Sequence, residues 1–343
     1  MSFKYKVLSI DGGGIRGIVP AIILKEIEQR TQKRIWELFD LIAGTSTGGF
    51  LAMILTMPNP ENPNTARYSM EEIINMYRKD GKNIFHEPFL ESLTEVDDLL
   101  RPKYPSEGRQ KIAEKYFQDA VLQDALTNIF ITSYDIELRV PVFFINNSTF
   151  QRHSGTSFRK LCTDYKMIEA AMATSAAPTF FEPYKLAMRG CDDAGDYALV
   201  DGAMFANNPT ALAIVEAIIY SQNHGEEIGL ENILVASFGT GSLTRKFPYD
   251  EAVNWGKLQW LQPLINIFLD GASEVANYQL RQLLPDAQNI DKQYYRFQKE
   301  LTEANDDLDN TTEENMKLLE KVAHTIISEQ SRELDKLCEH LGA

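Results

Sequence analysis

Two short apolar segments near the N-terminus each stop abruptly at a cluster of small residues. Residues 5–10, "YKVLSI", run into "DGGG", and residues 39–44, "FDLIAG", run into "TSTGG". Apolar residues at helical spacing follow each of them, over 18–31 and 49–57. A buried strand that turns at once into a helix is the repeating unit of a parallel sheet. This pattern limits the possible folds more than any other feature of the chain.

The same pattern continues through the first two thirds of the sequence. Further strands are predicted at 128–136, 140–146, 197–202 and 232–241, with helices among them. Strands that are apolar throughout are typical of sheets that are covered on both faces. We therefore predict an α/β fold with a mostly parallel sheet between two layers of helices.

The composition changes near residue 245. Strands and helices alternate up to that point, whereas helical patterns dominate afterwards. We expect residues 1–245 to form the sheet domain and residues 246–343 to form a helical segment that packs on it. The last helix is expected to begin at "TTEE", where Thr311 and Glu314 have the spacing of a capping box.

The charge of the chain excludes some kinds of partner. The 343 residues carry a formal net charge of −15, which argues against a nucleic-acid polymer because no basic surface would offset its phosphates. The same charge argues against electrostatic docking on anionic lipid, so any membrane contact should be hydrophobic and local. Three scattered cysteines, with neither a signal-peptide pattern nor an apolar run of membrane-spanning length, predict a cytoplasmic protein.

The sequence "GTSTG" at 44–48 fits the G-x-S-x-G pattern of a nucleophile on a sharp corner between a strand and a helix. Gly44 and Gly48, with Gly49, are small enough to let strand and helix approach, so that the hydroxyl of Ser46 stands clear above the strand ends. An ordinary Gly/Ser turn is the alternative. The strand before the motif and the helix after it favour the nucleophile.

The sequence "DGGGIRG" forms a second corner of this kind. Gly12, Gly14 and Gly17 match G-x-G-x-x-G, the fingerprint of a dinucleotide site. Asp11 would repel a pyrophosphate there, and the next strand does not end in the acidic residue that holds a ribose. We favour a loop whose backbone N–H groups hold the oxyanion of an acyl transfer. Arg16 stiffens this loop or adds positive potential, unless it is an ordinary exposed charge.

A serine nucleophile needs a proton acceptor. None of the histidines follows a strand end, and surface positions are favoured for all five: His86, His153, His224, His324 and His340. Asp201 in "LVDGAMFANNP" is the better candidate, because "YALV" delivers it to a strand end and Gly202 and Ala203 leave room beside it. We expect it on the same sheet edge as Ser46, with its pKa raised by partial burial unless the oxyanion hole carries most of the catalysis. A tight turn after a strand is the alternative reading of "DGA".

In this order and approximate spacing, "DGGGIRG", "GTSTG" and "DGA" resemble the motifs of the patatin-like phospholipases, lipid acyl hydrolases with a Ser–Asp dyad. The segments "AAMATSAAPTFFEPY" at 170–184 and "SFGTG" at 237–241 are also similar to that family, so the resemblance covers nearly the whole chain. It implies a three-layer α/β/α sandwich related to the α/β-hydrolases, with residues 1–245 as the catalytic domain. It also implies that no metal and no cofactor are needed.

The resemblance further implies a role for each residue of the site. Ser46 would be the nucleophile and Asp201 the proton acceptor, while Gly13 and Gly14 would form the oxyanion hole with Arg16 nearby. Family members carry glycine or alanine after "DG", and Ala203 is the alanine form. The implied substrate is a phospholipid, a lysophospholipid or another acyl lipid, met transiently at a membrane or micelle surface.

Alternative functions use the same fold. The enzyme could be a phospholipase effector that a ligand or partner switches on, for example in bacterial defence, or an acyltransferase. A regulatory protein with a vestigial hydrolase fold is disfavoured because all three site elements are intact. The segment "WGKLQWLQPLINIFL" at 255–269 could line the acyl groove or touch lipid, although core packing is favoured. The acidic loops 191–196 and 305–310 lack the glycine and distal glutamate of a calcium loop.

Overall fold

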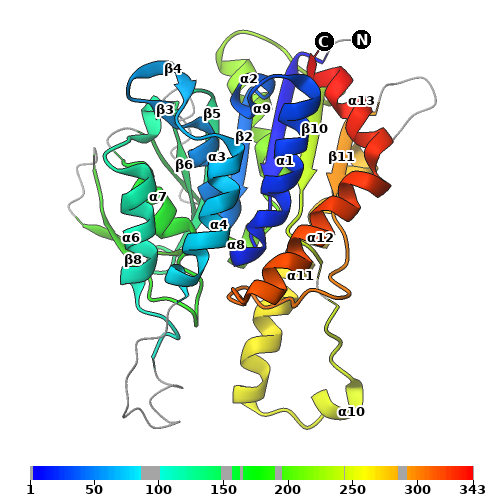
Figure 1. Cartoon of the computed structure of the whole chain (residues 1–343). Coiled ribbons are helices and arrows are strands. Elements are labelled where there is room, and N and C mark those ends of the chain that lie inside the picture. Colours follow the sequence, from blue (N-terminus) through cyan, green and yellow to red (C-terminus); the bar gives the residue numbers. More distant parts are fainter. Residues whose placement is uncertain are drawn as a thin grey trace.

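The computed structural model describes residues 3–85, 101–147, 157–162, 165–189, 195–242, 244–284 and 292–342 (Figure 1). These residues form one large sheet with helices on both of its faces, which confirms the predicted α/β fold. Among them, no helix combines the length and the apolar character needed to span a bilayer.

The sheet has nine strands within the described residues. They are β1 (Tyr5–Ile10), β2 (Leu41–Thr45), β5 (Asn128–Asp135), β6 (Val140–Ile145), β7 (Arg159–Leu161), β8 (Tyr184–Ala187), β9 (Asp196–Asp201), β10 (Ile233–Phe238) and β11 (Tyr294–Phe297). In the order β11, β10, β1, β2, β5 the strands run parallel. β6 is antiparallel to β5 and parallel to β7, and β9 is antiparallel to both β5 and β8. A separate hairpin joins β3 (Pro58–Asn59) and β4 (Asn62–Ala66).

Helices pack on the sheet from both sides. They are α1 (Ile18–Thr31), α2 (Ile35–Leu38), α3 (Thr47–Thr56), α4 (Met70–Ile84), α6 (Ser106–Phe117), α7 (Met167–Thr174), α8 (Ala203–Ala206), α9 (Thr210–Asn223), α10 (Tyr249–Ala252), α11 (Lys257–Leu283), α12 (Glu313–Glu329) and α13 (Ser331–Gly342). Short 3₁₀ turns are η1 (Gly14–Gly17), η2 (Leu122–Asp124) and η4 (Leu230–Asn232). One apolar cluster joins the sheet to α1, α3, α4, α12 and α13, and a second joins its opposite face to α9 and α11.

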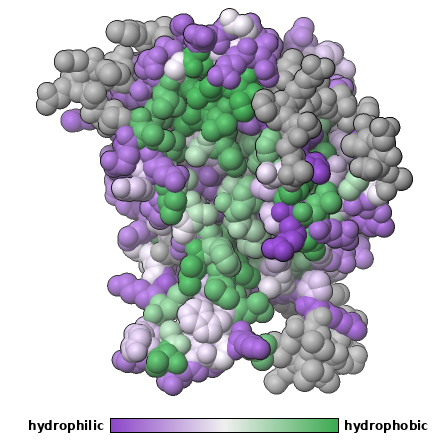
Figure 2. Space-filling view, turned by 180° about the vertical axis from the view of Figure 1, so that it is seen from behind, coloured by the Kyte–Doolittle hydropathy of each residue, from purple (hydrophilic) through white to green (hydrophobic). Residues whose placement is uncertain are grey.

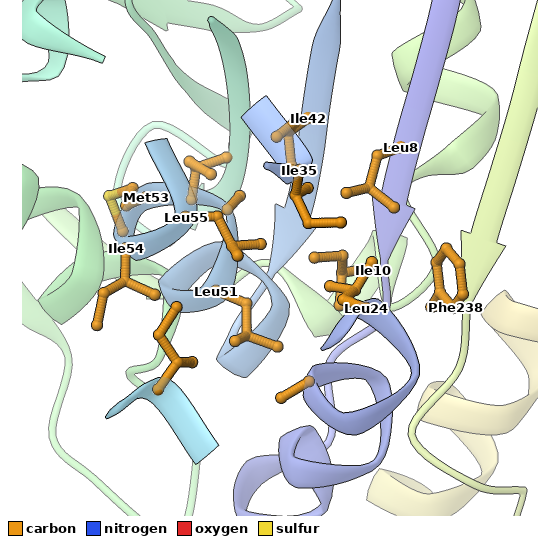
Figure 3. Close-up of a cluster of buried hydrophobic side chains, with 14 of the residues drawn as sticks. Leu8, Ile10, Leu24, Ile35, Ile42, Leu51, Met53, Ile54, Leu55 and Phe238 are labelled. Atoms are coloured by element: carbon orange, nitrogen blue, oxygen red, sulfur yellow. The ribbon is translucent and has the colours of Figure 1, made fainter. Parts of the chain in front are cut away.

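Successive residues of β1 serve these two layers in turn. Leu8 and Ile10 belong to the cluster shown in Figure 3, together with Leu24 of α1 and Leu51 of α3. Val7 points to the other face and belongs to the second cluster. Because side chains alternate across a strand, a sheet that is covered on both faces needs apolar residues at every position. This requirement explains the uninterrupted apolar runs in the sequence.

Two strands, β2 and β9, share one edge of β5. β6 pairs with residues 130–135 of β5 and occupies the other edge of that strand. β2 and β9 therefore lie end to end along one edge of β5 and run toward each other. Thr45 pairs with Thr132 and Asp201 pairs with Ser133, so the ends of the two strands meet. Asp201 thus reaches the level of Ser46 because an antiparallel strand stops there. The sequence analysis expected Asp201 and Ser46 at the same edge of the sheet but did not predict the antiparallel direction of β9.

The C-terminal part of the chain also contributes to the sheet. The sequence analysis did not predict β11, which pairs with β10. The expected single last helix is two helices, α12 and α13. The N-cap of α12 is Thr312, whose side chain accepts the N–H of Asn315, and not Thr311. The division of the chain at residue 245 stays a prediction.

Candidate active site

Ser46 stands at the corner between β2 and α3. It is the N-cap residue of α3 and has φ 55° and ψ −122°, a positive φ that residues with a side chain rarely adopt. The corner is tight, because a Cβ on Gly44 would lie 2.1 Å from the carbonyl oxygen of Gly48. A Cβ on Gly48 would lie 2.2 Å from the carbonyl oxygen of Ile10 on β1. Neither position accepts a side chain unless the backbone moves.

The side chains of Ser46 and Asp201 line the same pocket, and the Ser46 hydroxyl lies close enough to the Asp201 carboxylate to lower the pKa of that group. Asp201 is 2% exposed, and burial raises the pKa of its carboxyl group to about 6. The hydroxyl of Ser46, the N–H of Ala203 at 2.8 Å and the charge of Arg109 act in the opposite direction and lower the pKa. Asp201 is therefore ionised at pH 7, yet it accepts a proton more readily than an ordinary aspartate.

The end of α7 holds the backbones of both residues. Thr174, the last residue of α7, accepts the N–H of Ser46 on its Oγ1 at 2.9 Å and donates to the carbonyl of Thr132 at 2.7 Å. The carbonyl of Ala176 accepts the N–H of Asp201 at 3.0 Å. Sequence reasoning predicted a helix in this segment and noted its family likeness, but assigned no role to Thr174.

The glycine-rich loop between β1 and α1 faces the same pocket. Gly13 and Gly14 line that pocket together with Ser46. The N–H groups of Gly12 and Ile15 donate to carbonyls elsewhere in the chain. Within the described residues, no acceptor binds the N–H of Gly13 or of Gly14. Two backbone donors beside the serine thus remain available for a ligand.

Contacts with distant segments fix the shape of this loop. Ile15 donates its N–H to the carbonyl of Leu308 at 2.9 Å, and Thr240 donates its hydroxyl to the carbonyl of Gly12 at 2.7 Å. Gly14 has φ 57°, and a Cβ there would lie 2.2 Å from the carbonyl oxygen of Leu308. The loop therefore requires glycine at position 14 for both conformation and space.

Arg16 supports the loop from behind. It is 3% exposed, and it is not among the described residues that line the pocket. Its Nε donates to the carbonyl of Gly13 at 3.2 Å and its Nη1 to the carbonyl of Gly241 at 3.4 Å. Burial lowers the pKa of its guanidinium to about 10, so it stays charged at pH 7. The exposed-charge alternative is wrong, and the contacts are those of a residue that stiffens the loop.

Asp11 is buried beneath the same loop. Its carboxylate accepts hydrogen bonds from both Nη atoms of Arg296 on β11, at 2.8 and 2.6 Å. Because this charge is balanced, the argument that Asp11 would repel a pyrophosphate is wrong. The dinucleotide alternative meets a different obstacle: the free N–H groups face a largely apolar pocket that they share with Ser46.

A second buried arginine, Arg109 of α6, was not predicted. Its Nη1 donates to the carbonyl of Met172 at 2.8 Å and to Oγ of Ser175 at 3.1 Å, which ties α6 to the end of α7. Its Cζ lies 4.5 Å from the ring centroid of Phe181. Among the described residues no carboxylate forms an ion pair with it within 4.0 Å, and burial lowers the pKa of its guanidinium to about 10. The charge of Asp201 partly opposes that shift, so the two groups interact at longer range.

The pocket that Ser46 and Asp201 share has mainly apolar walls. Large members of these walls are Phe50, Met76, Phe85, Phe180, Phe181 and Leu308. Ile265 and Leu269 of α11 form a further part of the wall. The expectation of core packing for 255–269 is wrong for the segment as a whole, because only some of its residues are buried and others are exposed.

The described histidines lie away from this pocket. His224 and His324 are exposed, and the ring of His340 packs against Phe3 with centroids 5.3 Å apart. His86 and His153 lie outside the described residues, as do residues 191–194 of the first acidic loop.

Comparisons with known proteins agree with this architecture. The model of the family described as patatin-like phospholipase matches residues 8–214. Patatin-like protein 1 of Arabidopsis thaliana is 31% identical over 96% of this chain and 83% of its own length. "Probable inactive patatin-3-Kuras 1" of Solanum tuberosum is 32% identical over 95% of this chain and 87% of its own. Patatin-like protein 2 of Oryza sativa subsp. indica is 32% identical over 96% and 85%. The chain therefore belongs to the patatin-like phospholipase family.

Proposed function

We propose that this protein hydrolyses the acyl esters of lipids, with Ser46 as the nucleophile and Asp201 as the proton acceptor. Family membership supports a lipid acyl hydrolase activity in general. The observation that carries the specific proposal is that Ser46 and the buried carboxylate of Asp201 lie together in one apolar pocket, where the serine hydroxyl acts on the pKa of the carboxylate. Because one relative is named as probably inactive, this pair of residues is a stronger argument for activity than the family alone.

In the acylation step, Oγ of Ser46 attacks the ester carbonyl carbon while Asp201 takes the hydroxyl proton. The charge that develops on the carbonyl oxygen would be held by the N–H groups of Gly13 and Gly14. The N-terminal end of α3 adds positive potential, since Ser46 is its N-cap residue. When the bond to the alcohol oxygen breaks, Asp201 returns its proton to that oxygen, and an acyl-serine remains.

In the deacylation step, water attacks the acyl-serine and Asp201 takes a proton from it. The acyl–oxygen bond breaks, the proton passes to Oγ of Ser46, and a free fatty acid leaves. A carboxyl group with a pKa of about 6 suits both directions of transfer, because an efficient base has a pKa near the working pH. Arg109 favours the ionised, proton-accepting form of Asp201.

The walls of the pocket indicate the class of substrate. Phe50, Phe85, Phe180 and Phe181 would contact an acyl chain, for which they offer a wide apolar surface. We therefore assign phospholipids, lysophospholipids and other acyl lipids as substrates, with the acyl chain in the pocket and the ester carbonyl at Ser46.

Labelling with a fluorophosphonate probe, followed by peptide mapping, tests the nucleophile. We expect the label on Ser46, no label in Ser46→Ala, and little in Asp201→Asn, because the serine then lacks its base. Ser69→Ala, which removes a capping serine of α4, should label like wild type. A label on another residue, or none on the wild-type protein, would contradict the proposal.

Product analysis with a phospholipid substrate tests the reaction. Free fatty acid as the main product, lost in Ser46→Ala, is the expected result. Transfer of the acyl group to an added alcohol in preference to water would favour the acyltransferase alternative.

A further inference from the structure

The first turns of α11 expose a group of large apolar side chains. We call Leu258, Leu261, Leu264, Ile267 and Phe268 the docking face; they are between 41% and 67% exposed. In Figure 2, hydrophobic side chains gather along the lower middle of the molecule, where Figure 1 places this helix. Single exposed apolar residues are ordinary on proteins, but a contiguous group of them marks a contact surface.

The docking face lies in an uncharged part of a strongly charged chain. Residues 258–269 include no acidic or basic residue, although 24% of the whole sequence is charged. At about 100° per residue, the five exposed side chains spread over about half of the helix circumference. The contact surface between two packed helices covers a narrower stripe of each helix than this. A surface this wide and this uncharged fits a hydrocarbon layer, which can surround a helix, better than it fits a single partner helix.

Aromatic residues gather where α10 leads into α11. The rings of Trp255 and Trp260 have centroids 5.1 Å apart, and Phe247 lies 5.5 Å from Trp255. Tyr249 on α10 is 79% exposed. Tryptophan and tyrosine favour the boundary between hydrocarbon and water, because one end of each ring system is apolar and the other is polar. This neighbourhood has the composition of an element that lies in a membrane interface.

The docking face is continuous with the pocket that contains Ser46. Ile265 and Leu269 lie on the adjoining side of the same helical turns, and they line the pocket. Leu264 and Phe268, their neighbours along the chain, are exposed. An acyl chain that moves along α11 from the outside would therefore meet apolar surface until it reaches Ser46.

We propose that the docking face inserts into the surface of a zwitterionic phospholipid membrane, from which the enzyme draws its substrate. This inference rests on the proposed function, since it names the surface that presents the lipid to that site. A net charge of −15, with Asp250 and Glu251 on α10, disfavours an anionic surface and leaves hydrophobic insertion as the attraction. The depth required is small, because interfacial helices sink their apolar face about 5–10 Å into the lipid.

A second copy of the chain is the rival occupant. A seam between two α11 helices would continue along the helix through Val275, seven residues after Phe268, and Tyr278, three residues further on. These two side chains are 56% and 66% exposed. Insertion of the first turns into lipid would not involve these two residues, because they lie about 10 Å or more further along the axis.

Binding to phosphatidylcholine vesicles tests the proposal without catalysis, in a Ser46→Ala background. We expect flotation with vesicles that is insensitive to salt, because no ion pair drives it. The triple variant Leu261→Gln, Leu264→Gln, Phe268→Gln should bind at least about a hundredfold more weakly, since each residue buries a large apolar side chain. The matched triple variant Val215→Gln, Val275→Gln, Tyr278→Gln should bind like wild type. Absence of wild-type binding, or equal binding by the docking-face variant, would overturn the proposal.

Fluorescence locates the contact on α11. Trp36→Phe leaves Trp255 and Trp260 as the only tryptophans. Their emission should shift to the blue with vesicles and should be quenched by brominated phosphatidylcholine. An emission unchanged by vesicles would place the contact elsewhere and defeat the proposal. A wild-type dimer that both triple variants convert to monomer would assign the face to a second copy instead.

Activity separates this inference from the proposed function. In the active protein, the docking-face variant should hydrolyse a short soluble ester at the wild-type rate but should lose at least about tenfold in rate on phosphatidylcholine vesicles. Loss of both activities in wild type would defeat the proposed function. Equal vesicle rates for wild type and variant, with soluble activity intact, would defeat only the docking.

Discussion

Replacing Asp201 by Asn should inactivate the enzyme and stabilise it at the same time. Folding raises the pKa of this carboxyl group from 3.8 to about 6, mainly by burial. Because the folded pKa is the higher one, the stabilising effect of the protonated group is complete below about pH 3.8 and is lost as the pH rises through about 6. A shift of about two units corresponds to about 3 kcal/mol of unfolding free energy, which the ionised wild type lacks at pH 8. Asparagine carries no charge, so its burial does not incur the free-energy cost of burying a carboxylate. Its side-chain oxygen can still accept the N–H of Ala203.

Urea unfolding of both proteins at pH 8 and pH 5 measures this effect. We expect Asp201→Asn to be more stable by about 3 kcal/mol at pH 8 and by about half as much at pH 5, where wild-type Asp201 is mostly protonated. Asp250→Asn, at an exposed position of α10, removes the same charge without changing a buried site and is the matched control. An Asp201→Asn protein that is no more stable than wild type at pH 8, or whose gain is the same at both pH values, would refute the reasoning from burial.

Further predictions concern the reaction. The value of kcat/KM for a soluble ester should rise with pH through about 6, as Asp201 loses its proton, and a profile that is flat from pH 5 to 8 would contradict its role as the base. Arg109→Met should move this midpoint to higher pH because a charge that favours ionised Asp201 is removed, while Arg109→Lys should restore part of the shift; unchanged midpoints would argue against the interaction. Gly14→Ala should lower kcat by at least about a hundredfold, because the added Cβ would lie 2.2 Å from the carbonyl oxygen of Leu308 and would displace the N–H donors of the loop. Gly271→Ala, where an added Cβ meets nothing within 4 Å, is its control, and equal activity of the two variants would argue against the loop as an oxyanion hole.

Much of the fold could be predicted because the pattern of apolar residues indicates which segments are buried. The strand at 5–10 and the helix at 18–31 have the predicted bounds, because β1 is buried between both helical layers and α1 buries its first seven residues and Ile27. The directions of β6 and β9 were not predicted, because an apolar run has no direction. One available signal was overlooked: the strands predicted at 128–136 and 140–146 are too close for a crossover, so they had to form an antiparallel hairpin.

The site was predictable only where chemistry depends on local sequence. Ser46 and the glycine loop lie at corners whose small residues are visible in the chain. The contacts of Thr174 and Arg109 depend on which distant segments meet, and Arg109 stands in the polar stretch "SEGRQK", which is typical of a solvated helix. β11 was missed for a related reason, because its four residues include Arg296, which is buried only by pairing with Asp11.

The meeting of β2 and β9 along one edge of β5 gives Ser46 and Asp201 unequal support. β2 is enclosed between β1 and β5, with four and five paired residues. β9 forms three residue pairs with β5, and its other partner is β8, a strand of four residues. Opening of the β8–β9 ribbon would therefore withdraw the carboxylate while the serine corner stays folded. Under the proposed mechanism, a change in that ribbon would alter activity while Ser46 stays in place.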